Sequence, residues 1–379
     1  MTDQRVHKVA LTLHEEGHKV VLVGRKKSNS SDLEPRPYKT KRFTLLFEKG
    51  ILFYANYNLR LFFYLLFTRF DMLLSNDLDT LLPNFLVSKI KKKRLVYDTH
   101  EYFTGVPELI NRHFIRNVWK SLENYIFPKL ETIYTVNDSI ARLYGEEYSK
   151  NIAVVRNLPM KTAQKNIEFE FGFIEASYSE TAVVLNLIYE ALKLENRKII
   201  IYQGAVNKDR GLEEMIEAMQ YVENALLLII GTGDLYKKLK NDLKKLDYSH
   251  KIVLPGPIPM QYLSNFTKLA TIGISIEKPT NINYKYASPN KVVDYIHAGV
   301  PVLASKLVEV EKLLQNYQVG GFIDNHSPTH IAARVNEMIA NESKLKKWRN
   351  NCKKAAEELN WEKEKKILKE IFTFPKISS

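Results

Sequence analysis

Two short polar runs in the second half of the chain have residue types and spacing suited to phosphate binding. In residues 202–219 (YQGAVNKDRGLEEMIEAM), an aliphatic strand ends near Gly204, Lys208 and Arg210 follow, and a helical pattern begins. A loop leading from a strand into a helix offers free backbone N–H groups and the positive end of the helix dipole. Arg210 can add a bidentate contact. An ordinary basic loop would have the same composition, so this run alone does not establish phosphate binding.

The second run, residues 288–305 (SPNKVVDYIHAGVPVLAS), predicts a helix with a cation in its first turn. Ser288 and Pro289 suit the helix start, as N-cap and first-turn proline. Lys291 then lies where the helix dipole disfavours a cation, a conflict that a bound anion removes. Asp294 follows one turn later and can face the same site. The alternative is an exposed Lys–Asp pair of little energetic value.

A glycine-rich turn, GTGD, occupies residues 231–234 after another aliphatic run. Gly231 and Gly233 let the backbone approach a ligand, or they merely turn the chain. The sequence shows no carboxylate pair at metal-ligand spacing at the end of a strand. It therefore predicts no metal and no other cofactor.

Short aliphatic runs alternate with helical patterns along most of the chain, which predicts parallel sheets covered by helices on both faces. A length of 379 residues favours two domains. We therefore expect an α/β protein of two doubly wound, Rossmann-like domains, with the linker in the irregular segment 161–196. The expected strands are 19–24, 71–75, 94–98, 132–136 and 152–156, then 198–203, 225–230, 251–255, 271–276, 301–305 and 320–324.

The chain opens on a helical pattern, because Val6, Val9, Ala10 and Leu13 have helical spacing. A doubly wound sheet normally opens with a strand and a tight glycine turn. We therefore expect the first strand of the N-terminal domain to be absent.

The net charge of +13 is concentrated at the N-terminus, where residues 1–160 hold 25 Lys and Arg against 17 Asp and Glu. Such an excess suits solubility, an anionic membrane surface or lipid-linked substrate, or, least favoured, nucleic acid. The basic cluster 90–94 fits a solvated helix end, and the aromatic run 61–67 fits a packed helix. We therefore expect no nucleic-acid partner.

Cys352 is the single cysteine, which excludes an internal disulfide framework and indicates a reducing compartment. No signal peptide is visible. The most apolar stretch, 51–74, is interrupted by Asn56, Asn58, Arg60 and Arg69, whereas a spanning helix needs about 20 apolar residues. The expected location is cytoplasmic, with peripheral contact at the inner face of the membrane as an option.

The run S-P-N-K-x-x-D-Y-x-x-A-G-x-P-V-x-A-S resembles the donor-site helix of glycosyltransferase family 4 and its GT-B relatives. The loop G-x-x-x-x-x-R-G (204–211) is similar to that family's diphosphate loop, and GTGD and PGPIP (255–259) fall where it has nucleotide-contacting turns. In the first half, TDQRVHKVALTLHEEGHKVVLVGR, YDTHE (97–101) and VVRNLP (154–159) resemble its acceptor domain. The resemblance covers nearly the whole chain and keeps the motif order.

This resemblance implies a GT-B fold, with two Rossmann-like domains facing across a cleft. Residues 1–165 would form the acceptor domain and 197–359 the nucleotide-sugar domain, with a helix at about 360–379 packing back on the first. The implied reaction transfers a sugar, with retention, from a nucleoside-diphosphate sugar to a hydroxyl of a polysaccharide or lipid-linked glycan precursor.

The resemblance also assigns roles to individual residues. Arg210 would contact the donor diphosphate with Lys291 as a second cation, Asp294 would hold the ribose hydroxyls, and His100 would face the donor sugar. Arg210, Lys291 and His100 are the implied catalytic residues. The implied donor-binding residues are Gly204, Arg210, Gly231, Gly233, Ser288, Asn290, Lys291 and Asp294.

One departure from the family concerns its Glu-x7-Glu motif. The second glutamate is replaced by Asp294, and the first falls at Tyr286, which has no carboxylate. Glu277 is a candidate replacement from a different position. Two other function classes stay open at this point: a sugar-nucleotide epimerase of the same fold, and a catalytically impaired nucleotide- or anion-binding protein.

Overall fold

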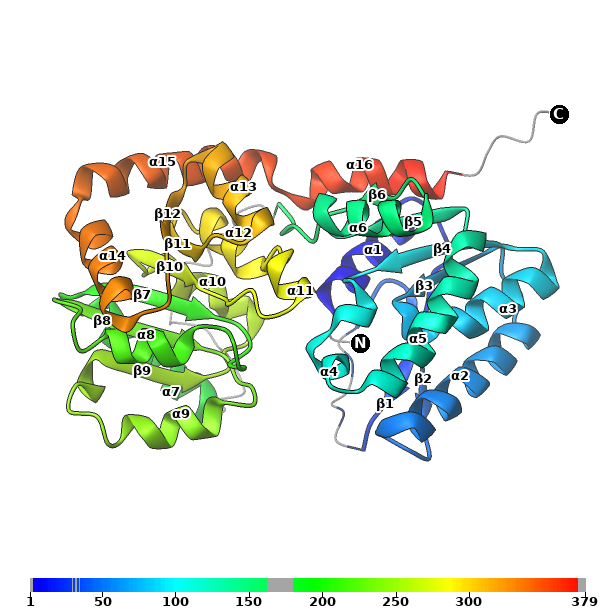
Figure 1. Cartoon of the computed structure of the whole chain (residues 1–379), viewed down its shortest axis with the longest axis horizontal. Helices are drawn as coiled ribbons and strands as arrows, with labels where there is room; N and C mark the ends of the chain where they lie inside the picture. The colour runs from blue at the N-terminus through cyan, green and yellow to red at the C-terminus, as the bar shows by residue number, and fades with distance from the viewer. Residues whose placement is uncertain (1–2, 29, 31–32, 34, 162–179, 374–379) are drawn as a thin grey trace. The chain divides into compact units, whose positions relative to one another are not determined.

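The computed structural model (Figure 1) describes residues 3–28, 30, 33, 35–161 and 180–373. The chain forms two compact units: residues 1–157 together with 362–379, and residues 158–361. The boundary after Asn157 precedes the segment 161–196 in which the sequence places the linker. Residues 162–179 of that segment lie outside the described residues, and its helical end is α7 (Glu180–Lys193) of the second unit.

The first unit, here called the N-terminal unit, contains two parallel sheets. Strands β3 to β6 form a four-stranded sheet in sequence order, and β1 pairs only with β2 among the described residues. Its strands are β1 (Val21–Lys26), β2 (Lys39–Thr44), β3 (Met72–Asn76), β4 (Arg94–Thr99), β5 (Thr132–Thr135) and β6 (Ala153–Val154). Its helices are α1 (Gln4–Glu15), α2 (Gly50–Phe67), α3 (Leu81–Lys91), α4 (Pro107–Ile110), α5 (His113–Ile126), α6 (Asp138–Tyr148) and α16 (Trp361–Phe372).

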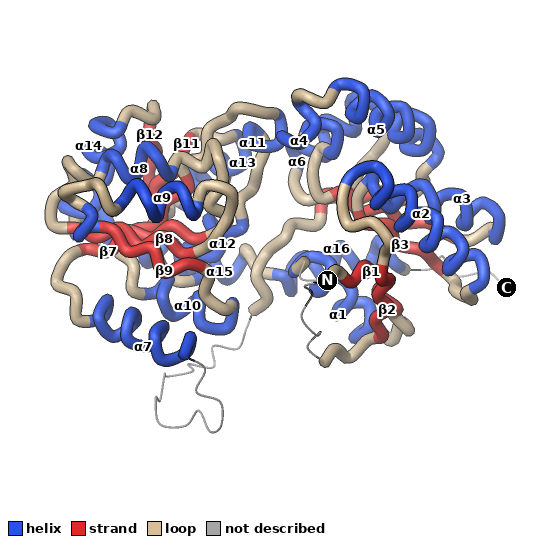
Figure 2. Tube along the Cα trace, turned by 90° about the horizontal axis from the view of Figure 1, so that it is seen from below, coloured by secondary structure: helices blue, strands red, loops and turns tan. Residues whose placement is uncertain are grey.

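Helices cover both faces of the four-stranded sheet. Figure 2 shows α2, α3 and α5 on one face and α1 and α16 on the other. Helix α16 is attached to this unit by polar contacts: Arg156 donates two hydrogen bonds from its guanidinium to Glu364, and Arg94 donates to the carbonyls of Ile371 and Thr373. The last helix of the chain therefore packs beside strands that lie more than 200 residues earlier.

The second unit, here called the C-terminal unit, holds one six-stranded parallel sheet in the order β12-β11-β10-β7-β8-β9. Its strands are β7 (Lys198–Gln203), β8 (Ala225–Ile230), β9 (Ile252–Gly256), β10 (Ile272–Ser275), β11 (Val302–Ser305) and β12 (Gly320–Ile323). Its helices are α7, α8 (Leu212–Ala218), α9 (Tyr236–Leu243), α10 (Met260–Lys268), α11 (Ile282–Lys285), α12 (Asn290–His297), α13 (Val308–Tyr317), α14 (Pro328–Ala340) and α15 (Glu342–Glu358).

The core of this unit follows from its strand sequences. Alternate residues of β7 point to opposite faces: Ile200 and Tyr202 join one apolar cluster, and Ile199 and Ile201 join the other. Helices α8, α9 and α14 cover one face and α7 and α10 the other (Figure 2). Strands buried on both faces need continuous apolar runs, which is why ALLLII at β8 was recognisable in the sequence.

The strand order reverses between β7 and β10, because consecutive strands proceed from β7 toward β9 on one side and from β10 toward β12 on the other. In open parallel sheets, ligands bind outside the carboxyl ends of the strands at such a switch point. The residues that follow β7 and β10 are therefore the first place to look for a site.

Candidate active site

A buried ion pair lies at the carboxyl ends of β7 and β10. Glu277, two residues beyond β10, is fully buried, and Lys291 in the first turn of α12 donates to its Oε1 at 2.6 Å. The Ser275 hydroxyl donates to the other carboxylate oxygen at 2.8 Å. Burial alone raises the pKa of Glu277, but the charge and hydrogen bond of Lys291 outweigh it, so the pKa lies below its ordinary value.

Arg210 reaches the same carboxylate from the loop after β7. Its Nη1 lies 3.6 Å from Glu277 Oε1, and its guanidinium stacks over the Tyr284 ring at 4.7 Å from the centroid. The Arg210 Nε is buried and has no hydrogen-bond partner. One carboxylate therefore contacts two cations, Arg210 and Lys291, and these three groups together carry a charge of +1.

Glycine lies beside Lys291 and lines the two neighbouring loops. Gly204, directly after β7, has φ +133°, and a Cβ there would lie 3.5 Å from Lys291 Cε. A Cβ on Gly231 would lie 1.9 Å from the Gly204 carbonyl oxygen, and one on Gly233 would lie 2.2 Å from Asn207 Oδ1. The two loops after β7 and β8 therefore pack backbone to backbone only because these positions are glycine.

Asp294, one turn after Lys291, lies beside the end of β7. Gln203 Nε2 donates to Asp294 Oδ2 at 3.2 Å, and Gln203 Oε1 in turn accepts from the Thr267 hydroxyl at 2.7 Å. Asp294 is partly exposed, whereas Lys291 is buried. The structure thus brings Gly204, Arg210, Lys291 and Asp294 to the carboxyl end of β7.

The start of α12 differs from the prediction. The helix begins at Asn290, and its N-cap is Pro289, whose backbone is extended (φ −63°, ψ 126°), so Ser288 lies outside the helix and does not cap it. Ser288 and Asn290 are both exposed. Tyr286, at the position of the missing glutamate, is the C-cap of α11. Glu277, the candidate replacement, contacts both Arg210 and Lys291 directly.

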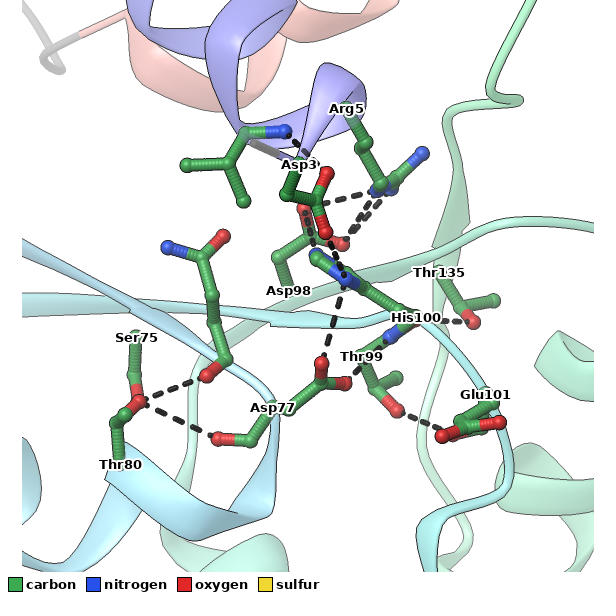
Figure 3. Close-up of polar contacts among 12 residues, drawn as sticks. Asp3, Arg5, Ser75, Asp77, Thr80, Asp98, Thr99, His100, Glu101 and Thr135 are labelled. Carbon is green, nitrogen blue, oxygen red and sulfur yellow. Dashed lines mark hydrogen bonds and ion pairs between the residues drawn. The ribbon is translucent and has the colours of Figure 1, made fainter. Parts of the chain in front are cut away.

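A second polar cluster lies in the N-terminal unit around His100 (Figure 3), which directly follows β4. His100 Nδ1 lies 3.2 Å from Asp77 Oδ2, and Nε2 lies 3.3 Å from Asp98 Oδ2. Burial lowers the pKa of the imidazole, but the charges of Asp77 and Asp98 outweigh it and raise that pKa to about 10. The two flanking carboxylates thus favour the protonated form of the His100 ring.

Arg5 of α1 completes this cluster. It is buried and donates to both oxygens of Asp98 at 2.7–3.2 Å and to the Val155 carbonyl. Burial alone raises the pKa of Asp98, but the charges of Arg5 and His100 lower it to about 2. Asp79 and Glu101, by contrast, have pKa values raised to about 7 by burial and by the charge of Asp77. Two carboxyls near His100 thus titrate near neutral pH.

Sequence reasoning did not single out Asp77, Asp98 or Arg5 as site residues. Asp98 lies within the motif YDTHE, two residues before His100, so this motif is the sequence feature that indicates Asp98 as a site residue. Asp77 and Arg5 reach His100 only through the folded sheet. Among the residues that the structure describes, no group of three or more His, Cys, Asp or Glu side chains is suited to hold a metal ion. Independence from metals stays a prediction.

Comparisons with known proteins show which families the chain resembles. Residues 187–356 match the family model described as Glycosyl transferases group 1, and residues 3–158 match Glycosyltransferase Family 4. The chain is 23% identical over 249 residues to the chitobiosyldiphosphodolichol beta-mannosyltransferase of Candida albicans, covering 59% of this chain and 51% of the relative. It is 25% identical over 190 residues to an uncharacterized glycosyltransferase of Methanocaldococcus jannaschii, covering 48% and 46%. The chain spans about half the length of these curated relatives.

Solved structures share the fold over most of the chain. WaaG, a glycosyltransferase involved in lipopolysaccharide biosynthesis, superposes with a TM-score of 0.68 at 13% identity, covering 98% of this chain and 96% of that one. Sucrose-phosphate synthase from Thermosynechococcus elongatus gives 0.71 at 14%, covering 97% and 91%. Anabaena HepE in complex with UDP-glucose gives 0.64 at 14%, covering 88% and 85%.

Fold and sequence together define the class as glycosyltransferases of the GT-B fold. The two family models match consecutive parts of the chain, one for each unit. The chain belongs to glycosyltransferase family 4. No helix in the described part of the chain is long and apolar enough to cross a membrane.

Proposed function

We propose that this protein transfers a sugar from a nucleoside-diphosphate sugar to a hydroxyl group of a polysaccharide or lipid-linked glycan precursor, with retention of configuration. The observation that carries the proposal is the convergence of Arg210 and Lys291 on Glu277 at the switch point. Two cations with one carboxylate leave a positive site beside bare glycine backbone, which suits a diphosphate. HepE, which shares the fold, was solved with UDP-glucose bound.

In this reaction, the bond between the sugar C1 and the diphosphate oxygen breaks, and a bond from C1 to the acceptor oxygen forms. The acceptor hydroxyl loses its proton, and the diphosphate leaves with additional negative charge. Arg210 and Lys291 are placed to stabilise that charge, which grows between ground state and transition state. Asp294, at the edge of the same site, is assigned to the ribose hydroxyls.

Binding measurements on variants test the donor site. Replacing Arg210 with Ala is expected to weaken nucleoside-diphosphate binding by about 1.5–3 kcal/mol and to leave nucleoside binding nearly unchanged, because Arg210 is assigned to phosphate. Asp294→Ala should weaken both ligands. Titration calorimetry with UDP, GDP and ADP and their nucleosides measures this. If both variants bind nucleoside diphosphates like the wild type, the donor site is elsewhere.

We also propose that the N-terminal unit docks on an anionic membrane surface of the cytoplasmic side, where a lipid-linked acceptor would lie. The support is a set of exposed apolar side chains on helices α2, α3 and α5, which together cover one face of the sheet (Figure 2). These side chains are Ile51, Leu52, Leu59, Phe63 and Phe67 on α2, Leu86 and Ile90 on α3, and Phe114, Val118 and Tyr125 on α5.

The charges on these three helices fit an anionic partner. The structure describes every residue of α2, α3 and α5, and their single acidic residue, Glu123, is buried. Arg60, Lys89 and Arg116 are exposed on them, and the basic cluster Lys91–Arg94 ends α3 and begins β4. Basic residues near an anionic surface contribute about 1 kcal/mol each, and exposed apolar side chains add to this at the interface.

Vesicle sedimentation tests the docking proposal. The protein should pellet with vesicles containing anionic lipid and not with neutral vesicles, and high salt should release it. Leu59→Ser combined with Phe67→Ser should reduce pelleting, whereas Leu194→Ser, an equally exposed apolar position in the C-terminal unit, should not. Absence of binding to both kinds of vesicle would favour an acceptor in solution.

A further inference from the structure

Asp77 contacts His100 twice. One carboxylate oxygen accepts the His100 backbone N–H at 2.9 Å, and the other lies 3.2 Å from the ring Nδ1 (Figure 3). A single side chain thus fixes both the backbone and the imidazole of the residue that follows β4. Such a two-point contact leaves the ring little freedom to rotate.

The backbone of Asp77 is unusual in a way that serves this contact. Its φ of +57° with ψ 167° is a backbone conformation that L-residues other than glycine rarely adopt. The conformation lets the Asp77 N–H donate to the Asp98 carbonyl at 2.9 Å while its carboxylate faces His100. The Thr80 hydroxyl holds the preceding turn by donating to the Asn76 carbonyl at 2.7 Å. Unfavourable backbone geometry held in place by neighbours is typical of functional sites.

The charged groups around the ring come from three elements. Asp3 and Arg5 lie at the start of α1, Asp77 and Asp79 follow β3, and Asp98 and Glu101 flank His100 along β4 and its loop. Asp98 is already engaged by Arg5, whose guanidinium donates to both its oxygens. Of the two carboxylates nearest the ring, Asp77 is therefore the one whose charge no arginine shares in a direct contact.

The two ring nitrogens differ in their surroundings. Nδ1 faces Asp77, whereas Nε2 lies 3.3 Å from Asp98 Oδ2 without being aligned for a hydrogen bond. The flanking carboxylates favour the ring form with a proton on both nitrogens, and the buried Nε2–H is a donor without a hydrogen-bond partner.

We propose that Asp77 is a positioning residue that holds His100 as a doubly protonated ring, so that His100 acts as a fixed cationic hydrogen-bond donor and not as a base. The place of His100 in catalysis rests on the proposed function, but the state of its ring does not. The proposal therefore has a test that needs no substrate.

NMR titration of the histidine rings in the labelled full-length chain provides that test, with the His100 signal assigned from the His100→Gln variant. In the wild type, both ring nitrogens should stay protonated at pH 8. In Asp77→Asn, whose amide oxygen can still accept the backbone N–H, the midpoint should fall from about 10 to below pH 8, a shift of about two to three units. Asp79→Asn, a matched change two residues away, should shift it less.

Two results would overturn the proposal: a wild-type His100 that is neutral at pH 8, or a folded Asp77→Asn protein with an unchanged midpoint. A wild-type ring that is neutral at pH 8 would overturn the proposal even if the variant fails to fold.

Enzyme assays add a second readout that a purely structural role would not produce. Asp77→Asn should keep much of its transfer activity at pH 6, where its His100 is still protonated, and lose it at pH 8. Its nucleotide affinity should stay at the wild-type value, because the donor residues lie in the other unit. An activity loss equal at both pH values would contradict the proposal, whereas failure of the proposed function would show as no transfer in the wild type.

Discussion

In the buried pair of Glu277 and Lys291, a single carboxylate keeps a cation at the switch point. Lys291 is only 8% exposed, and its nearest anion is Glu277. A buried cation without a partner is strongly unfavourable. Glu277 therefore holds both cations in place, and in the proposed donor site this differs from the role of a sugar-binding carboxylate considered for it from the sequence.

Replacing Glu277 with Gln should lower the free energy of unfolding of the C-terminal unit by about 3–5 kcal/mol, because it leaves the Lys291 ammonium buried and unpaired. Urea denaturation measures the change. Lys306→Gln is the matched control, since it breaks an ion pair with Asp324 that lies in solvent, and it should leave stability nearly unchanged. A fully stable Glu277→Gln protein would mean that the pair does not hold the site together.

Charge around His100 makes the stability of the N-terminal unit depend on pH. The pKa of His100 is raised to about 10, so its contribution is complete below about pH 6.5 and is lost as the pH rises toward 10. Thermal denaturation from pH 6.5 to 10 should show the wild type losing stability, and His100→Gln should lose much less. An equally steep alkaline loss in His100→Gln would assign the effect to other groups.

Backbone strain at Asp77 gives a comparison of two substitutions. Glycine adopts a positive φ without steric cost, whereas alanine does not, and both remove the carboxylate. Asp77→Gly should therefore be more stable than Asp77→Ala by about 1 kcal/mol, measured by urea denaturation. Equal stability of the two would show that the positive φ at this position carries no strain.

The sequence identified some of these residues and not others, for a physical reason. Lys291 and Asp294 lie one turn apart in one predicted helix, so their spacing alone indicates a common face, whereas the family resemblance added Arg210 to them. Asp77 and His100 are 23 residues apart on neighbouring strand ends, and Arg5 is 93 residues from Asp98. Their meeting depends on strand order, which local patterns do not contain.

At the scale of elements, apolar strands were predictable and polar ones were not. Strands β7 and β8 match the predicted ranges 198–203 and 225–230 because their buried residues form unbroken apolar runs. Strand β2 (KTKRFT) was missed because three of its six residues are charged and only one is a large hydrophobe. The segment is extended because it pairs in parallel with β1, and its composition does not indicate this pairing.

The glycines that follow β7 and β8 allow the two loops after these strands to approach each other closely. A Cβ on Gly231 would overlap the Gly204 carbonyl oxygen at 1.9 Å, so Gly231→Ala should force the ends of β7 and β8 apart. Gly299, at the end of α12, also has a positive φ (+72°) but has open space around a Cβ. Gly299→Ala should then cost about 1 kcal/mol and keep nucleotide binding, whereas Gly231→Ala should weaken both stability and binding. Calorimetry on both variants checks this, and equal effects would contradict it.

At the scale of the whole molecule, the chain leaves one unit and returns to it. Residues 158–361 form one compact unit, and the other is closed by residues 362–379. The helix at the end of the chain was expected from the resemblance and not from its own pattern, since an amphipathic helix does not indicate which of two sheets it covers. In the structure, Glu364 is 1% exposed and accepts hydrogen bonds from the backbone N–H and the guanidinium of Arg156.

This division leads to a prediction for thermal unfolding. A nucleoside diphosphate at about 100 times its dissociation constant should stabilise the unit that binds it by about 2.7 kcal/mol, and the proposed binding residues all lie in the C-terminal unit. Glu364→Gln should destabilise the N-terminal unit, because it removes the charge that Arg156 contacts at a buried position. Differential scanning calorimetry should therefore show two transitions, of which the ligand raises one and Glu364→Gln lowers the other. Glu370→Gln, at an exposed position of the same helix, is the control and should change neither. A single transition that responds equally to ligand and to Glu364→Gln would mean that the two units unfold together.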